Sequence, residues 1–130
     1  MLKLIIAGSR TFKCYEIVQR ATDEIIEKLK KSGYNCDEVE IVSGTATGAD
    51  HLGELYAVRN GFHVKMFPAD WNEYGNKAGP IRNGVMAKYA DACIVFWDGK
   101  SRGSKSMIEL AKERKIPCYI ITMTYKIEAV

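Results

Sequence analysis

Nearly continuous apolar runs alternate along the chain with stretches in which apolar residues recur at helical spacing. The runs "LIIA", "ACIVFW" and "CYIITM" are typical of strands buried on both faces of a sheet. In residues 13–31, by contrast, apolar residues return every three or four positions, which predicts an amphipathic helix. The whole pattern predicts strands at residues 2–7, 39–42, 62–67, 92–97 and 118–123, and helices at residues 13–31, 49–59 and 107–114, with a further helix ending at Tyr89.

The alternation of strands and helices, joined by short connections, indicates βαβ units that build a parallel sheet with helices on both faces. The length of 130 residues suits one domain with one core. We therefore expect a single Rossmann-like three-layer αβα domain over residues 1–130, with a mostly parallel sheet of about five strands.

Composition and charge exclude several classes of protein. The net charge of +3 is mild, so the chain lacks the strongly basic balance of a dedicated duplex-DNA binder. The four cysteines form no Cys-x-x-Cys pair and the two histidines stand apart, so we expect no disulfide framework, no metal site and a reducing, cytoplasmic location. The apolar run before Gly8 is too short for a signal peptide or a membrane span.

Small and polar residues follow each of the first four predicted strands. The segments are "GSR" at 8–10, "SGTATGAD" at 43–50, "ADWNEYGNKAGPIRN" at 69–83 and "DGKSRGSKS" at 98–106. The carboxyl ends of parallel strands share one edge of a sheet, where open α/β sheets bind their ligands. Glycine is common in strand–helix turns, which accounts for one or two of these segments. Four such segments on one edge favour a binding site.

The segment 43–50 is neither a Gly-x-Gly-x-x-Gly motif nor a Walker A sequence. Its glycines allow the backbone to approach a ligand closely. Asp50 lies in the first turn of a predicted helix, where a carboxylate is either a simple cap or a group that repels phosphate and suits a ribose hydroxyl. We expect a sugar here, with contacts from Ser43, Gly44, Thr45, Gly48 and Asp50.

The segment 98–106 offers hydroxyl groups and positive charge around Gly103, which suits a phosphate at a helix start. An ordinary solvated basic turn is the alternative. Arg82 lies at the start of another helix, where the dipole disfavours a cation unless an anion is bound or an ion pair forms with Asp70 or Glu73. The predicted contacts on this side are Arg82, Asn83, Arg102, Gly103, Ser104 and Ser106, with Gly8, Ser9 and Arg10 completing the rim.

Two aromatic residues of the 69–83 segment, Trp71 and Tyr74, lack the alternation that would bury them. With Asp70, they fall beside the predicted phosphate site. Exposed aromatic rings in such a place suit stacking against a base, although they serve equally well to cover the core or to pack in a dimer.

These segments together resemble the SLOG superfamily, whose small Rossmann-like members include the "lonely guy" phosphoribohydrolases, the DNA-processing protein DprA and short YspA/YpsA-like proteins of bacteria and phages. "GSRTF", "SGTATGAD", "FPADWNEYGNKAGPIRN" and "DGKSRGSKSMIELA" are most similar to the YspA-like branch. The resemblance covers nearly the whole chain. It implies a nucleotide-derived ligand and a homodimer, with no required cofactor.

In the phosphoribohydrolases, a Pro-Gly-Gly-x-Gly-Thr-x-x-Glu motif binds the 5′-phosphate and supplies a catalytic Glu. The resemblance aligns Gly103 with the second Gly, Ser106 with the Thr and Glu109 with the Glu, and it implies Arg82 as the assisting arginine. Ser101 and Arg102 replace the Pro-Gly of that motif, and Lys105 replaces a Gly. The loop is therefore bulkier and more basic, which suits a more highly phosphorylated ligand.

Three functions follow from these residues and the resemblance. The first is binding of a nucleotide, NAD or ADP-ribose by a sensor or processing protein. The second is cleavage of an N-glycosidic bond, with Glu109 and Arg82 as the catalytic pair. The third is binding of single-stranded nucleic acid as in DprA, against which the mild net charge speaks. The sequence leaves open whether the protein is an enzyme.

Overall fold

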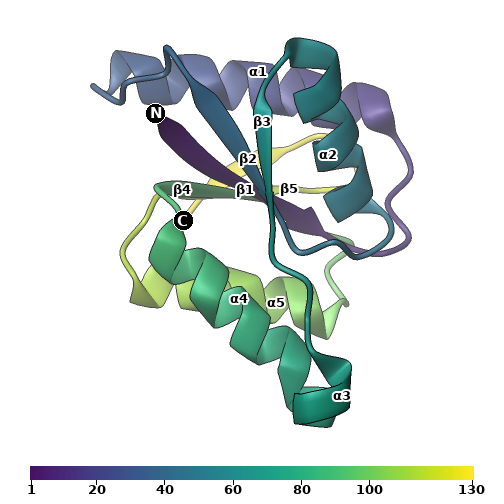
Figure 1. Ribbon diagram of the computed structural model, residues 1–130. Coiled ribbons are helices and arrows are strands. Elements are labelled where there is room, and N and C mark those ends of the chain that lie inside the picture. Colours follow the sequence, from purple (N-terminus) through teal and green to yellow (C-terminus); the bar gives the residue numbers. More distant parts are fainter.

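Six strands form one sheet in the computed structural model, which describes all 130 residues (Figure 1). The order across the sheet is β3-β2-β1-β4-β5-β6; the first five strands run parallel, and β6 runs antiparallel to β5. This confirms a Rossmann-like α/β fold with a mostly parallel sheet. The strands are β1 (Leu2–Gly8), β2 (Val39–Ser43), β3 (His63–Met66), β4 (Ala92–Phe96), β5 (Cys118–Ile121) and β6 (Ile127–Ala129).

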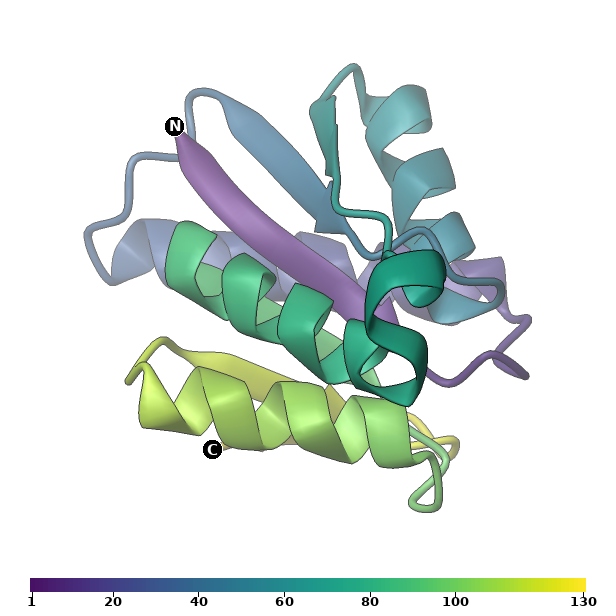
Figure 2. The same ribbon diagram turned by 60° about the horizontal axis from the view of Figure 1, so that its bottom comes forward.

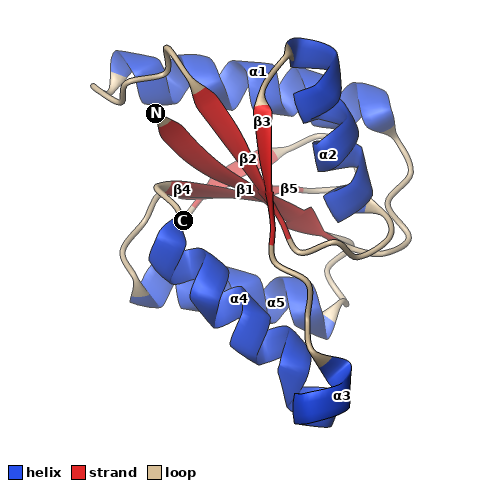
Figure 3. Cartoon of the chain, in the orientation of Figure 1, coloured by secondary structure: helices blue, strands red, loops and turns tan.

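Helices cover both faces of the sheet and make the three layers expected from the sequence (Figure 3). One face carries α1 and α2, whereas α4 and α5 lie side by side on the other, as the rotated view also shows (Figure 2). None of the helices combines the length and the apolar character needed to cross a membrane. The helices are α1 (Tyr15–Lys31), α2 (Ala49–Asn60), α3 (Trp71–Tyr74), α4 (Ala78–Tyr89) and α5 (Arg102–Glu113), with a 3₁₀ turn, η1, at Gly75–Lys77.

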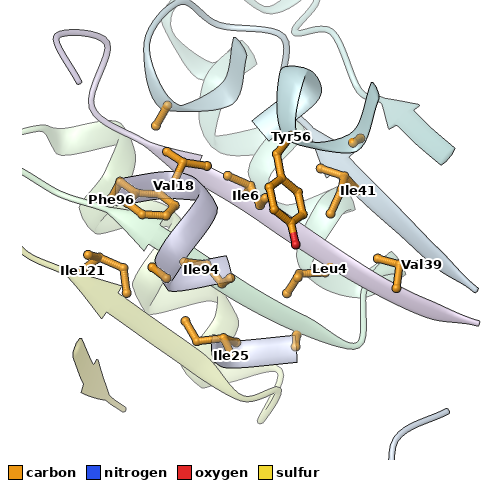
Figure 4. Packing of buried hydrophobic residues seen from close by; sticks show 14 of the residues in the cluster. Leu4, Ile6, Val18, Ile25, Val39, Ile41, Tyr56, Ile94, Phe96 and Ile121 are labelled. Carbon is orange, nitrogen blue, oxygen red and sulfur yellow. The ribbon is translucent and has the colours of Figure 1, made fainter. Parts of the chain in front are cut away.

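Side chains of the central strands alternate between two cores, one on each face of the sheet. In β1, Leu4 and Ile6 enter the core that α1 and α2 cover, whereas Ile5 belongs to the core beneath α4 and α5. Figure 4 shows the first core, where Phe96 of β4 packs near Ile6. The ring of Phe96 also packs on Phe12, at a centroid distance of 5.2 Å. Burial on both faces explains why these strands are almost continuously apolar in sequence.

The strand order reverses between β1 and β4. The chain moves outward from β1 through β2 to β3, and then returns to place β4 on the other side of β1. The carboxyl ends of β1 and β4 are in register, with Gly8 opposite Phe96. Because the connections after these two strands lead to opposite faces of the sheet, they leave a crevice beyond the strand ends.

Three elements are not predicted by the sequence pattern: β6, α3 and the 3₁₀ turn η1 that directly follows α3. β6 is too short to show a period, and its pairing depends on a turn at residues 122–126, in which the Thr122 N–H donates to the carbonyl of Lys126 at 3.0 Å. α3 is a single turn that Asp70 caps by accepting a hydrogen bond from the Glu73 N–H at 3.1 Å. The carboxylate of Asp70 thus has a local structural role.

α5 begins earlier than predicted, at Arg102 rather than near Met107. Ser101 is the N-cap: its Oγ accepts a hydrogen bond from the Ser104 N–H at 3.4 Å and another from the Ser104 hydroxyl at 3.2 Å. The segment "SRGSKS" is therefore the start of a helix and not a free loop. Of the serines that resemble a loop in sequence, Ser101 caps the helix, whereas Ser104 and Ser106 lie within it.

Candidate functional site

A cavity of about 360 Å³ opens where β1 and β4 end. This main cavity joins the β1–α1 connection, the β2–α2 loop, α4 and the first turns of α5. It therefore lies at the edge where sheets of this topology bind ligands. The lining residues are Ala7, Gly8, Ser9, Arg10, Thr11, Gly44, Ala46, Asp50, Arg82, Asn83, Met86, Asp98, Ser101, Gly103, Ser104 and Met107.

Ser9 links three connections at the floor of the main cavity, and it is almost fully buried. Its N–H donates to the carbonyl of Phe96 at 2.9 Å, and its own carbonyl accepts from the Ala49 N–H at 3.2 Å. Its hydroxyl oxygen accepts from the Asp98 N–H at 3.0 Å. The ends of β1 and β4 and the start of α2 are thereby held in one arrangement.

The first turn of α5 brings backbone N–H groups to this edge. Ser101 accepts the hydrogen bond of the Ser104 N–H. The N–H groups of Arg102 and Gly103 have no partner within the helix, because no helical turn precedes them. Gly103 and Ser104 both line the main cavity. A helix N-terminus in this position favours an anion, because its free N–H groups and its dipole both attract negative charge.

Asp98 shapes the turn that precedes α5. Its Oδ1 accepts hydrogen bonds from the N–H groups of Lys100 and Ser101, both at 2.8 Å. These backbone hydrogen bonds lower the pKa of Asp98. The Asp98 carboxylate lies near the start of α5, but its Oδ1 already accepts hydrogen bonds from N–H groups of the protein itself.

Asp50 is the buried carboxylate of the main cavity, with 5% of its surface exposed. Its Oδ2 accepts a hydrogen bond from the Ala46 N–H at 3.1 Å, whereas Oδ1 accepts none from the protein. Burial raises the pKa of Asp50 to about 6, although the Ala46 N–H and the Arg82 charge act in the opposite direction. The free oxygen is available to a hydroxyl or N–H donor on a ligand.

Arg82 reaches from α4 to the β2–α2 loop. Its Nη1 donates to the carbonyl of Gly44, and its Nε donates to Asn83 Oδ1 at 2.8 Å. Burial lowers the pKa of Arg82, while nearby Asp50 opposes that shift. A Cβ on Gly44 would lie 2.7 Å from Arg82 Nη1 and 2.9 Å from Asp50 Oδ2. A side chain at position 44 would therefore displace the Arg82 guanidinium or the Asp50 carboxylate.

The four charged side chains of the wall balance, because Arg10 and Arg82 are cationic while Asp50 and Asp98 are acidic. A cavity for a polyanion would carry an excess of positive charge. This cavity suits a ligand that combines a limited negative charge with neutral hydrogen-bonding groups. No group of three or more His, Cys, Asp or Glu side chains is arranged to hold a metal ion.

A side cavity of about 260 Å³ adjoins the main one. Trp71 contributes to its wall, is half exposed, and packs against α4, since a Cβ on Gly79 would lie 3.5 Å from its ring. Thr45, also in the wall, has a positive φ of 64°, which is uncommon for a residue other than glycine and is found preferentially at functional sites. The residues shared by the two cavities are Arg10, Gly44, Ala46 and Arg82.

Residues 2–74, more than half of the chain, match the YspA, cpYpsA-related SLOG family. The chain belongs to this family. The Gene 61 protein of Mycobacterium phage D29 is 33% identical over 123 residues, which cover 90% of this chain and 94% of that protein. The resemblance to the YspA-like branch that the sequence motifs indicated is thus confirmed.

Two solved structures share the fold of this SLOG protein. DprA from Streptococcus pneumoniae matches with a TM-score of 0.66 and 22% identity, over 93% of this chain and 50% of that one. DprA from Helicobacter pylori matches with a TM-score of 0.63 and 23% identity, over 92% of this chain and 65% of that one. The SLOG protein therefore spans only part of either DprA, and the likeness at these identities establishes the fold alone.

Most of the residues predicted to contact a ligand meet at the two cavities of this SLOG protein. They come from four connections that are far apart in sequence. Thr45 and Trp71 line the side cavity. Those that line the main cavity are Gly8, Ser9, Arg10, Gly44, Asp50, Arg82, Asn83, Gly103 and Ser104.

Three further predicted residues lie outside the wall of the main cavity and support its surroundings. Ser43 is fully buried, donates to Glu54 Oε2 at 2.5 Å and accepts from the Thr45 N–H at 3.1 Å, so it holds the β2–α2 loop. Gly48 packs under the β1–α1 connection. Asp70 caps α3, and Arg82 forms no ion pair with it or with its neighbours in that segment.

The remaining three predicted residues, Arg102, Ser106 and Glu109, lie on α5 outside both cavities. Because the helix begins at Arg102, Ser104 and Met107 face the main cavity, while Glu109 lies about 140° around the helix axis from Ser104. Arg102 and Glu109 are exposed. This orientation gives no support to Glu109 as a group that touches a ligand in the main cavity, and Arg102 adds no charge to the wall.

Several lining residues are not among the predicted ligand contacts. Asp98 precedes Gly99 directly after a strand, a turn signal that would have identified it. Met86 and Met107 follow helical spacing and are indistinguishable in sequence from core residues. The full set is Ala7, Thr11, Ala46, Met86, Asp98, Ser101 and Met107.

Proposed function

We propose that this SLOG protein binds a nucleotide-derived ligand of the ADP-ribose or NAD class in the main and side cavities. The observation that carries the proposal is that a helix N-terminus, two arginines and a buried carboxylate with a free oxygen meet in one cavity. These groups suit a phosphate and a sugar hydroxyl on the same molecule. The balanced charge of the wall supports such a ligand over a bare polyanion.

In this proposal the phosphate lies against the first turn of α5, within reach of Arg82 and Arg10. A sugar hydroxyl donates to the free oxygen of Asp50. The base extends into the side cavity against Trp71, where stacking on an aromatic ring contributes roughly 1–3 kcal/mol per base. The sharing of lining residues between the two cavities supports a ligand that occupies both.

Calorimetric titration with ADP-ribose, NAD and AMP tests this function. We expect saturable binding of at least one of them, and an affinity at least about tenfold weaker in Arg82→Met, because a hydrogen bond to a charged group contributes about 1.5–3 kcal/mol. Arg114→Met is the matched control, since Arg114 is exposed and lies outside both cavities. Folded protein that binds none of the three ligands would overturn the proposal.

Single-stranded nucleic acid is the second candidate ligand, favoured by the exposure of Trp71 and Tyr74. The DprA of Helicobacter pylori, whose fold this chain shares, has a single-stranded DNA binding mode. An oligothymidylate in the same titrations separates the candidates. Binding along a phosphate backbone weakens steeply as salt is added. Tight, strongly salt-dependent binding of the oligomer without binding of ADP-ribose, NAD or AMP would favour nucleic acid.

We also propose a homodimer through the apolar surface beside α4. Met66, Tyr74, Ile81 and Val85 line one shallow hollow there, and each is more than 40% exposed. Sedimentation velocity should give a dimer for the unmodified protein and a monomer for Ile81→Asp. Val58→Asp, at an exposed apolar residue of α2, should remain dimeric. A monomeric unmodified protein at every concentration tested would refute the dimer.

A further inference from the structure

Asn83 is a buried polar residue whose two amide atoms contact two different parts of the site. It is 7% exposed and directly follows Arg82 in α4. Its Oδ1 accepts from Arg82 Nε at 2.8 Å, and its Nδ2 donates to the carbonyl of Gly103 at 3.2 Å. The side chain therefore links the Arg82 guanidinium to the first turn of α5.

The two partners fix the orientation of the Asn83 amide. A guanidinium nitrogen only donates and a carbonyl oxygen only accepts. An inverted amide would place donor against donor at Arg82 and acceptor against acceptor at Gly103. Burying a polar group without a hydrogen-bond partner destabilises the protein. The amide consequently holds one orientation, with its oxygen toward Arg82.

The Arg82 guanidinium is held by hydrogen bonds at two of its nitrogen atoms. Asn83 accepts from Nε, and the Gly44 carbonyl accepts from Nη1. Because the guanidinium is planar and rigid, two fixed N–H groups determine its plane. The N–H groups that these two partners do not use remain available to a ligand. The charged groups nearest to the guanidinium are Asp50 on α2 and Arg10 on the β1–α1 connection.

We propose that Asn83 is a positioning residue: it sets the plane of the Arg82 guanidinium and fixes it relative to the N-terminus of α5, so that both approach the same anionic group of the ligand. The part that concerns the ligand rests on the proposed function. The rival role is that of a link between α4 and α5, which needs only the hydrogen bond from Nδ2 to Gly103.

Two variants separate these roles. Asn83→Asp keeps an acceptor for Arg82 Nε and loses the donor to Gly103, whereas Asn83→Ala loses both. The readout is the exchange with water of the Arg82 Nε–H in proton–nitrogen correlation spectra, assigned by the absence of its signal in Arg82→Lys. We expect exchange about tenfold slower than for exposed Arg114 in the unmodified protein and in Asn83→Asp, and exchange like that of Arg114 in Asn83→Ala.

Fast exchange of the Arg82 Nε–H in the unmodified protein would overturn the inference, and this measurement stands even if Asn83→Ala fails to fold. Equal loss of protection in both Asn83 variants would favour the helix link. The affinity for ADP-ribose should fall about tenfold in Asn83→Ala. Unchanged affinity despite a released Arg82 would overturn the ligand part. If the unmodified protein also binds no ADP-ribose, the proposed function fails for that ligand, while the exchange data still decide whether Asn83 holds Arg82.

Discussion

We expect the substitution Gly48→Ala to lower the free energy of unfolding by about 3 kcal/mol or more. Gly48 has φ 77° and ψ −128°, a conformation that residues with a side chain rarely adopt. A Cβ there would lie 2.4 Å from the carbonyl oxygens of both Ser9 and Arg10. These are backbone atoms, so the β1–α1 connection must move to make room. Urea unfolding followed by circular dichroism measures the difference.

Gly61→Ala is the control, because Gly61 ends the same helix that Gly48 begins. It also has a positive φ, 69°, but a Cβ there would meet no atom within 4 Å. Its left-handed conformation alone should cost about 1–2 kcal/mol. A loss in Gly48→Ala no larger than in Gly61→Ala would mean that the predicted clash with the connection does not exist.

Asp50→Asn is expected to raise the free energy of unfolding by about 2 kcal/mol at pH 8 and to leave it nearly unchanged at pH 4. Burial raises the pKa of Asp50 from 3.8 to about 6. The folded protein therefore binds this proton more tightly than the unfolded chain does. The stability that the protonated group contributes is complete below pH 3.8 and is lost as the pH rises through about 6. An asparagine cannot ionise, so the Asp50→Asn protein does not lose this stability as the pH rises.

Denaturant unfolding at a series of pH values for both proteins measures the effect. Asp37→Asn is the control, because the side chain of Asp37 is exposed to water. A constant difference between Asp50→Asn and the unmodified protein from pH 4 to pH 8 would contradict the assignment. A buried carboxylate that lowers stability is typical of functional sites, where binding requires a group that folding does not.

Most of the sheet could be predicted from the sequence because strands buried on both faces leave a distinct apolar run. Every residue of β4 is buried, and the strand is visible in sequence as "ACIVF". β6 could not be predicted, since its three residues follow no period and pair with β5 only because the turn before them reverses the chain. Local pattern fails where an element depends on a distant partner.

The sequence predicts which strand ends and connections form the site. It does not predict the directions in which individual side chains point. Arg82 and Asp50 meet because the strands before them end at the same edge. Whether Glu109 faces the cavity depends on the residue at which α5 begins, and the capping role of Ser101 sets that residue. A hydroxyl such as that of Ser43 looks the same in sequence whether its partner is a ligand or a buried glutamate.

The way in which Ser9 holds the cavity floor has a consequence for evolution. Three of its four hydrogen bonds are made by its main-chain atoms, because its carbonyl also accepts from the Phe12 N–H, and only the bond from Asp98 needs the hydroxyl group. The geometry of the cavity floor is therefore largely independent of the side chains that surround it. Arg10 and Trp71, which are exposed, can be exchanged without disturbing that floor. Descendants of one ancestor can in this way acquire new ligand preferences while inheriting the same scaffold.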